Sequence, residues 1–203
     1  MKKQQIILIR HGQTQGNKEH RYVGSTDEAL LEESKNCICD ITGDFRHENL
    51  RLFVSPMLRA KQTAKALFPD RDAMVVDELR ECEFGDFEYK NYLELQGDKR
   101  YQAFIDSGGT IAFPNGESRE QFIHRTMIGF EKVLKESEDA QTIIIVAHGG
   151  TIMAMLDRLS YPHRDYFDWQ LSPLEAIQGY LCRMKDGYRI KNLELRKIRK
   201  SEG

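Results

Sequence analysis

Two short apolar runs that each end in a histidine and a glycine constrain this chain more than any other feature. Residues 6–9 (IILI) lead into Arg10-His11-Gly12, and residues 143–147 (IIIVA) lead into His148-Gly149-Gly150. Runs of this kind are typical of buried strands in an α/β sheet. Ligands of open α/β sheets bind beyond the carboxyl ends of the strands, so we expect both histidines at one site. An imidazole placed there favours nucleophilic or acid–base chemistry.

Strands and helices are expected to alternate along the rest of the chain. Expected strands lie at residues 5–10, 52–54, 73–76, 142–147, 176–184 and 188–195; expected helices lie at about 27–42, at 55–68, from 118 to about 135, and at 151–159. Asp27 is a good cap for the first helix and Gly43 a good stop, while Ser55 and Pro56 are typical first residues of the second. The alternation predicts a three-layer αβα sandwich with a mostly parallel, mixed sheet.

The length of 203 residues and a hydrophobic content of 40% fit one domain over residues 1–203. Residues 77–116 form an irregular segment that is long for a simple connection, and such segments often cover a site as a lid. The segment is rich in aromatic residues.

Composition excludes several classes of protein. The net charge of -2 argues against nucleic-acid binding, and the basic stretch at residues 196–200 is typical of a solvated tail. No apolar stretch approaches the ~20 residues of a membrane span, and the N-terminus shows no signal-peptide pattern. The cysteines lack metal-ligand spacing, so we expect free thiols in a reducing cytoplasm. They are Cys37, Cys39, Cys82 and Cys182.

Cationic and small residues gather where the two apolar runs end. Gly12 lets a ligand approach the backbone closely, and Arg10 offers planar paired donors that match phosphate oxygens. Asn17 adds a neutral donor. Arg59 lies about one turn into a helix that follows a strand end, from which it reaches the same crevice. Arg10, Arg59, His11 and His148 therefore form a candidate phosphate pocket.

Five segments, taken in order, resemble the histidine phosphatase superfamily, the phosphoglycerate mutase-like clan with an Arg-His-Gly motif. They are residues 8–17 (LIRHGQTQGN), 55–64 (SPMLRAKQTA), 79–87 (LRECEFGDF), 114–118 (PNGES) and 146–150 (VAHGG). The match spans residues 6 to about 160. An Arg-His-Gly motif alone is a weak signal, but the combination is highly specific.

The resemblance implies a phosphatase mechanism. His11 would be the nucleophile and form a phosphohistidine, and Arg10, Arg59 and His148 would cradle the phosphoryl oxygens. The arginines next to His11 favour its neutral form, which has the free lone pair. Glu81 aligns with the family's general acid. The resemblance implies no metal and no cofactor, because fixed cations take the place of a metal.

Further positions are expected at the pocket with a structural alternative for each. Thr14 and Asn17 either contact phosphate or support the loop and the end of the helix. Arg21, Tyr22 and Gly24 match the family's mobile loop at the pocket mouth, and they either bind substrate or only shape the loop. Gly149 is also expected among the phosphate-binding residues. Glu78 and Glu83 are the alternative acids near Glu81.

The sequence favours hydrolysis of a small-molecule phosphate ester. Glu81 and Glu117 are only 36 positions apart in the sequence, and this short segment leaves the pocket open to water. The chain is most similar to small bacterial members of the alpha-ribazole phosphatase type, although Tyr89 stands where that family often has glycine. The alternatives are a phosphoglycerate mutase-type phosphotransferase and a non-catalytic phospho-ligand-binding or signalling module. Association into a homo-oligomer stays open.

Aromatic residues of the 77–116 segment have two alternative roles. They line a face for a larger organic leaving group, or they form the core of the segment. These residues are Phe84, Phe87, Tyr89, Tyr92, Tyr101 and Phe104.

Overall fold

A computed structural model of the chain describes residues 4–39 and 49–198. Within these residues, seven strands form one mixed sheet in the order β3-β2-β4-β1-β6-β7-β5. The strands are β1 (Gln4–Arg10), β2 (Leu50–Val54), β3 (Met74–Val75), β4 (Thr142–Ala147), β5 (Ser160–Tyr161), β6 (Glu175–Met184) and β7 (Gly187–Lys197). β6 is antiparallel to both β1 and β7, and the other pairs are parallel. The expected α/β class and mostly parallel sheet are confirmed.

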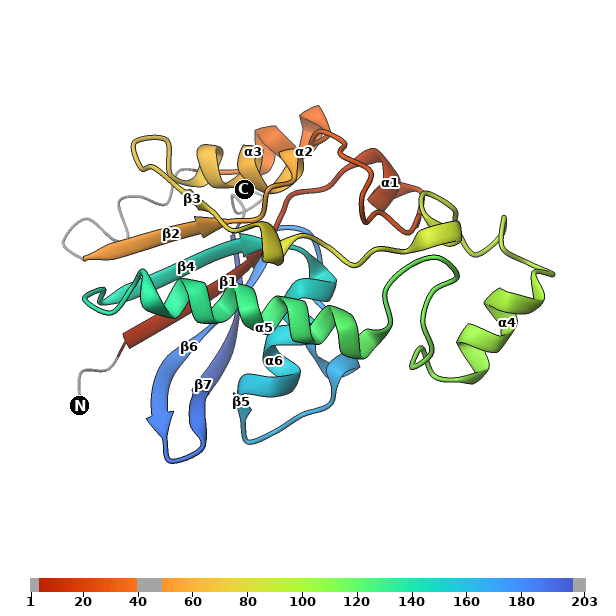
Figure 1. Cartoon of the computed structure of the whole chain (residues 1–203). Helices are drawn as coiled ribbons and strands as arrows, with labels where there is room; N and C mark the ends of the chain where they lie inside the picture. The colour runs from red at the N-terminus through yellow and green to blue at the C-terminus, as the bar shows by residue number, and fades with distance from the viewer. Residues whose placement is uncertain (1–3, 40–48, 199–203) are drawn as a thin grey trace.

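Helices cover both faces of the sheet (Figure 1). They are α1 (Gln15–Lys18), α2 (Glu32–Cys37), α3 (Leu58–Leu67), α4 (Lys99–Asp106), α5 (Arg119–Lys135) and α6 (Gly149–Leu159), with the short 3₁₀ helices η2 (Asp77–Leu79), η3 (Gly85–Phe87) and η4 (Tyr166–Trp169). Because side chains alternate along a strand, Ile7 and Ile9 pack with α3 on one face, while Ile6 and Leu8 pack with α5 and α6 on the other. This is the predicted three-layer arrangement.

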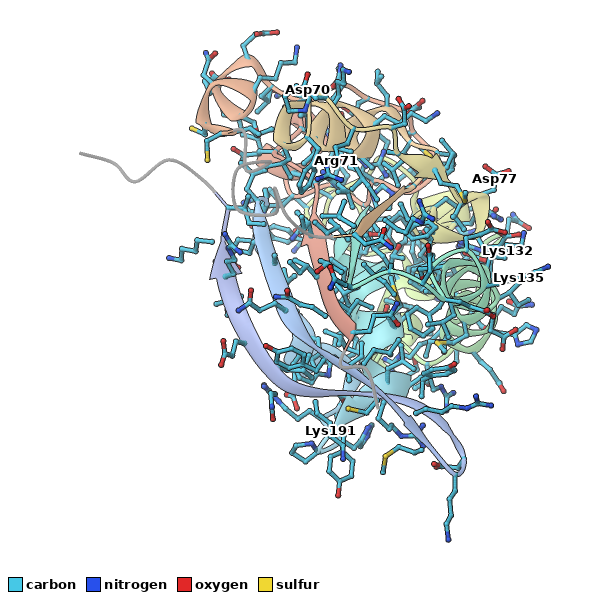
Figure 2. The ribbon with its side chains drawn as sticks, turned by 90° about the vertical axis from the view of Figure 1, so that its left-hand side faces the viewer. Asp70, Arg71, Asp77, Lys132, Lys135 and Lys191 are labelled. Carbon is cyan, nitrogen blue, oxygen red and sulfur yellow. The ribbon has the colours of Figure 1, made fainter. Side chains whose placement is uncertain are left out.

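The exposed residues of α5 are mainly polar. Figure 2 shows β6 and β7 as two long curved strands along one side of the molecule, and it places Lys132 and Lys135 on α5. Both of these lysines are exposed, whereas Phe130 and Val133 on the same helix are buried against the sheet. α5 is therefore an amphipathic covering helix.

A third, separate core lies beneath the segment that contains α4. It is built mainly from aromatic side chains, of which Phe87, Phe113 and Phe122 are buried. α4 itself has no fully buried residue, and it lies at one end of the molecule, away from the sheet (Figure 1). The segment at 77–116 is thus attached to the sandwich through an aromatic layer.

The helix expected at about 27–42 is much shorter where the structure describes it. α2 spans only Glu32–Cys37, and Gly43 lies outside the described residues. Asp27 does not cap this helix. Its Oδ1 accepts a hydrogen bond from the backbone N–H of Leu58 at 2.6 Å. Asp27 therefore provides a hydrogen-bond acceptor for a free backbone N–H group at the start of α3, which is distant in sequence but near in space.

The start of α3 also differs from the prediction. The helix begins at Leu58, after Met57 as N-cap, and neither Ser55 nor Pro56 has the predicted capping position. The hydroxyl of Ser55 instead contacts His148. α6 begins at Gly149, directly after His148 and two residues before the predicted start. The two-residue strand β5 was not predicted, because two residues are too few to show a strand period.

Candidate active site

His11 lies directly after β1, where its backbone N–H donates to Ala147 of β4 at 3.0 Å. The ring is buried, with Nδ1 2.7 Å from the carbonyl oxygen of Gly12. Since a carbonyl only accepts, Nδ1 carries the ring proton and Nε2 keeps its lone pair. Burial holds the pKa of His11 well below its usual range, and the charges of Arg59 and then Arg10 add to this effect. His11 is therefore held as a neutral imidazole with a free Nε2.

His148 is buried behind His11, with the two ring centroids 5.0 Å apart. Nε of Arg59 donates to Nδ1 of His148 at 3.3 Å, so the ring proton is on Nε2. That Nε2–H donates to the Ser55 hydroxyl at 2.6 Å. Burial lowers the pKa of His148 well below its usual range, and the charge of Arg59 is the next cause. Both histidines are therefore neutral.

Arg59 is fully buried beside the two histidines. Its Nη2 donates to the carbonyls of Val23 and Gly24 at 3.2 and 3.0 Å, and its Nη1 donates to that of Thr26 at 2.8 Å. Among the described residues, neither Arg59 nor His148 belongs to the wall of the polar pocket in front of His11. The structure brings both residues to His11, but it places them in the layer behind the imidazole.

The polar pocket has a volume of about 230 Å³. Arg10 is its main cation. Its Nη1 donates to the carbonyl of Leu171, while its buried Nε has no hydrogen-bond partner within the described part of the chain. A buried N–H of a guanidinium without a partner suits an anionic ligand. Seven of the residues predicted at the pocket line it: Arg10, His11, Asn17, Arg21, Tyr22, Glu81 and Gly149.

Asn17 and the fully buried Thr14 form a capping box around α1. The Thr14 hydroxyl accepts from the Asn17 backbone, and Oδ1 of Asn17 accepts from the Thr14 backbone, each at 3.3 Å. The side-chain amide N–H₂ of Asn17 is then its remaining donor at the pocket. Thr14 therefore supports the loop, and Asn17 closes the capping box and also lines the pocket.

Arg21 and Gly24 take mainly structural positions. Arg21 reaches the pocket wall, but its guanidinium is paired with Glu19 at 2.5 Å and with Glu94 at 2.6 Å. Gly24 is buried outside the wall, and its N–H donates to Glu88 at 3.0 Å. A Cβ at Gly24 would lie 2.1 Å from the carbonyl oxygen of Cys82, so this position requires glycine.

Glu81 is buried at the side of the pocket. Its Oε1 accepts from the backbone of Cys82 at 2.9 Å, and its Oε2 accepts from Gly150 at the start of α6 at 3.0 Å. Burial raises the pKa of Glu81 despite these hydrogen bonds and the nearby arginine charges. The alternative acids, Glu78 and Glu83, are paired with Lys132 and Arg80 respectively, and neither lines the pocket. The geometry therefore favours Glu81.

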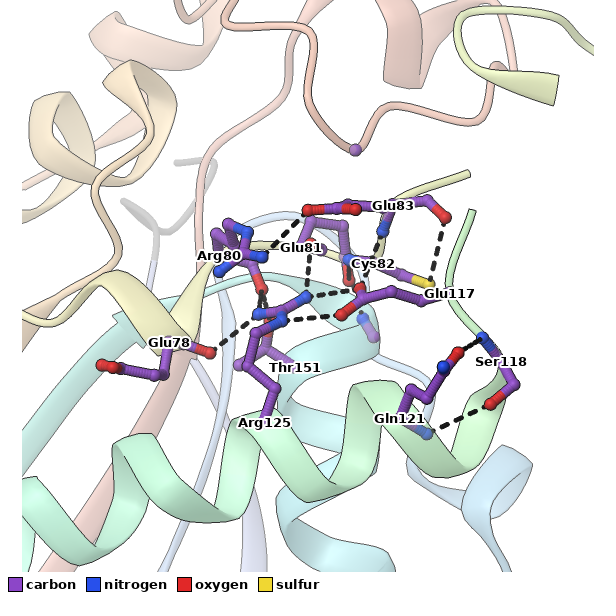
Figure 3. A network of polar contacts seen from close by, with 12 residues as sticks. Glu78, Arg80, Glu81, Cys82, Glu83, Glu117, Ser118, Gln121, Arg125 and Thr151 are labelled. Atoms are coloured by element: carbon purple, nitrogen blue, oxygen red, sulfur yellow. Dashed lines mark hydrogen bonds and ion pairs between the residues drawn. The ribbon is translucent and has the colours of Figure 1, made fainter. Parts of the chain in front are cut away.

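Arg125 was not identified from the sequence, although it holds the segment that carries Glu81. From α5 its guanidinium donates to the backbone carbonyls of Glu78, Arg80 and Glu81 at 2.9 to 3.1 Å (Figure 3). It also pairs with Glu117 at 2.6 Å. Glu117 belongs to the PNGES motif, but nothing in the sequence marks its partner. Ser55 lies in a predicted motif, but its hydroxyl contacts His148 and Ser55 is not the N-cap of α3.

The described residues contain no group of three or more His, Cys, Asp and Glu side chains arranged to hold a metal ion. No helix in this part of the chain has the length and apolar character needed to cross a membrane. The four cysteines are free.

Comparison with known proteins gives one family. The profile of the histidine phosphatase superfamily (branch 1) matches residues 6–190. The adenosylcobalamin/alpha-ribazole phosphatase of Salmonella typhimurium is 29% identical over 159 residues, covering 76% of this chain and 78% of that protein. The metal-independent phosphoserine phosphatase of Arabidopsis thaliana is 28% identical over 166 residues, covering 77% and 68%.

A solved structure shows the same fold. The alpha-ribazole phosphatase from Shigella flexneri superimposes with a TM-score of 0.77 at 24% identity, covering 96% of this chain and 98% of that one. The fold expected from the five sequence segments is therefore confirmed.

Proposed function

This chain belongs to the histidine phosphatase superfamily (branch 1), and we propose that it hydrolyses small-molecule phosphate monoesters through a phosphohistidine on His11, without a metal ion. The observation that carries the proposal is the 2.7 Å contact between Nδ1 of His11 and the Gly12 carbonyl, because it leaves Nε2 free as a nucleophile. The unpartnered Nε of Arg10 and the carboxyl of Glu81 lie in the same pocket.

In the first step, the Nε2 lone pair of His11 attacks phosphorus. The N–P bond forms as the bond between phosphorus and the leaving oxygen breaks, and the Glu81 carboxyl gives its proton to that oxygen. The raised pKa of Glu81 favours the protonated form that this step needs. The lowered pKa of His11 favours the neutral nucleophile.

In the second step, the Glu81 carboxylate accepts a proton from water, and the resulting hydroxide attacks phosphorus. The N–P bond breaks, inorganic phosphate leaves, and His11 and Glu81 return to their starting protonation states. Arg10 and Arg59 would stabilise the charge that spreads over the phosphoryl oxygens. His148, held by Ser55 and Arg59, would support the same charge from behind His11.

Hydrolysis is favoured over phosphoryl transfer to a second anionic substrate. The basic side chains of the 77–116 segment that such a substrate would need are largely paired: Arg80 with Glu83 at 2.9 Å, and Arg100 with Asp86 and Asp98 at 2.7 and 3.0 Å. The named activity of the Salmonella relative makes alpha-ribazole phosphate the first compound to test.

We also propose that residues 1–203 form a single domain that acts in the cytoplasm. Its four free cysteines fit a reducing compartment. Cell fractionation with an antibody against the chain would check the location.

The proposal is tested by phosphate release from a panel of monoesters in the presence and absence of EDTA. We expect equal rates in both conditions, and competitive inhibition by vanadate, whose trigonal bipyramidal form resembles the transition state. Loss of activity in EDTA that a divalent ion restores would contradict metal independence. Binding of esters without release of phosphate would favour the non-catalytic module, and transfer of the phosphoryl group to phosphoglycerate would favour the mutase.

A further inference from the structure

A second cavity, of about 450 Å³, adjoins the polar pocket on the side of Glu81. Both hollows are lined in part by the same residues: Tyr22, Glu81, Phe84, Gly150 and Met153. Glu81 therefore lies at the boundary between the cation-lined pocket and this second space. In a phosphate ester, the bond to be broken lies between the phosphoryl group and the alcohol, so the cavity lies where the alcohol would be.

The walls of the second cavity are mostly aromatic. Phe104 of α4 and Phe113 pack with ring centroids 4.3 Å apart. On another wall, Tyr166 and Phe167 of η4 lie 5.2 Å apart. The guanidinium of Arg119, at the start of α5, lies 5.1 and 4.8 Å from the centroids of these last two rings. The cavity is thus framed by flat apolar surfaces from three segments of the chain.

We propose that this cavity receives the alcohol part of the substrate and selects a flat, apolar group of at least two fused rings. The inference rests on the proposed function, since it places the leaving oxygen beside Glu81. A cavity of about 150 Å³ already holds one benzene ring, so this larger space suits a fused ring system. Rings placed against the wall aromatics gain stacking and edge-to-face contacts.

Small alcohols that carry an ammonium group fit the cavity poorly. Among the described residues, Glu81 is the one carboxylate on its wall, and the backbone N–H groups of Cys82 and Gly150 already engage it. The ammonium group of phosphoserine would therefore be buried without a suitable partner, which is costly. We expect this chain to discriminate against phosphoserine, in contrast to the named activity of the Arabidopsis relative.

The test compares 2-naphthyl phosphate with phenyl phosphate, since their leaving alcohols are similar in acidity and differ by one ring. We expect kcat/KM to be at least about tenfold higher for the naphthyl ester, mainly through a lower KM, because the added ring contributes binding rather than chemistry. Phosphoserine should be the poorest of the three substrates.

A matched pair of variants locates the effect. Phe167→Ala removes a cavity wall at a residue that is 52% exposed, and it should lower the naphthyl preference about fivefold or more. Tyr92→Ala removes an aromatic ring that is 58% exposed and does not line this cavity, and it should leave the preference unchanged. Equal kcat/KM for both esters in the wild type, or equal effects of the two variants, would overturn the inference.

A binding experiment separates this inference from the proposed function. The dissociation constants of 2-naphthyl phosphonate and phenyl phosphonate are measured by calorimetry, which requires no hydrolysis. Tighter binding of the naphthyl compound with no turnover of any ester would refute the hydrolase and keep the cavity assignment. Turnover of both esters with equal binding of the two phosphonates would keep the hydrolase and refute the cavity assignment.

Discussion

The strand-end site and the 77–116 segment are built in opposite ways. At the strand ends, His11, His148 and Arg59 are buried, and each is oriented by hydrogen bonds to backbone or buried hydroxyl groups. In the segment, α4 has no fully buried residue, and Arg100 is half exposed in its ion pair with Asp86. Exposed ion pairs stabilise little, so aromatic packing provides most of the attachment of the segment. The strand ends therefore carry His11 and His148, whereas the segment carries Glu81 and much of the wall of the second cavity.

The largest effect is expected from removing the nucleophile at the strand end. His11→Ala should lower kcat/KM by at least about 10⁴-fold for every ester, because no other described residue of the pocket wall offers a free nucleophilic nitrogen. Rapid quenching of the wild type with a ³²P-labelled ester should give protein-bound label that is stable to base and labile to acid. If His11→Ala still acquired this base-stable, acid-labile label, His11 would not be the nucleophile.

Glu81 lies where the two regions meet, so its substitution should affect some esters more than others. Glu81→Gln should slow esters with poor leaving groups by about 10²–10⁴-fold, and 4-nitrophenyl phosphate by at least about tenfold less, because nitrophenolate needs little protonation. Glu83→Gln, at the exposed partner of Arg80, is the control and should change neither rate much. If Glu81→Gln slowed both classes of ester equally, Glu81 would have a structural role and would not be the general acid.

The two neutral histidines make the strand-end site sensitive to acid. Below about pH 6.5 an unfolded chain protonates both residues, whereas the folded chain does not, since burial lowers their pKa values. The free energy of unfolding therefore falls as the pH falls, by up to about 1.4 kcal/mol per pH unit for each histidine. Glu81, whose pKa is raised, acts in the opposite direction above its ordinary pKa of about 4.3.

Urea denaturation between pH 7 and pH 5 measures this effect. His148→Gln should lose stability less steeply than the wild type, by the contribution of one histidine. His124→Gln should follow the wild type, because His124 is exposed on α5. Parallel pH profiles for all three proteins would mean that His148 takes up a proton in the folded chain.

Local patterns in the sequence were enough to identify the strands that carry the site. The apolar runs before His11 and His148 are fully buried strands, and the parallel pairing of β1 with β4 brings their ends together as expected. The motifs likewise identified Arg10 and Glu81, which the structure places in one pocket.

Contacts between side chains and distant backbone were not predictable in this way. Asp27 and Ser55 were both assigned as helix caps by residue type, yet one serves a different helix and the other contacts a histidine 93 residues away. Arg125 holds three carbonyl groups that lie more than 40 residues before it. Such contacts follow from the packing of the layers and have no periodic signal along the chain.

Tyr89 joins the 77–116 segment to the loop between α1 and α2, and it gives the smallest expected effect. It stands where the family often has glycine, and its φ of 58° lies in the left-handed region. Its hydroxyl donates to Glu28 at 3.2 Å, and Arg21 lies over its ring. These contacts offset a backbone conformation that disfavours any side chain.

Comparing Tyr89→Gly with Tyr89→Ala isolates the backbone, since both variants lose the ring. We expect the glycine variant to be the more stable by about 0.5–1 kcal/mol in urea denaturation. The left-handed conformation costs alanine about 1–2 kcal/mol, and glycine loses part of that advantage through its more flexible unfolded chain. Gln102, an exposed residue of α4, is the control. There Gln102→Ala should be more stable than Gln102→Gly by about 1 kcal/mol, because glycine disfavours a helix. If Tyr89→Ala were as stable as Tyr89→Gly, or more stable, the left-handed backbone at position 89 would not be a source of strain.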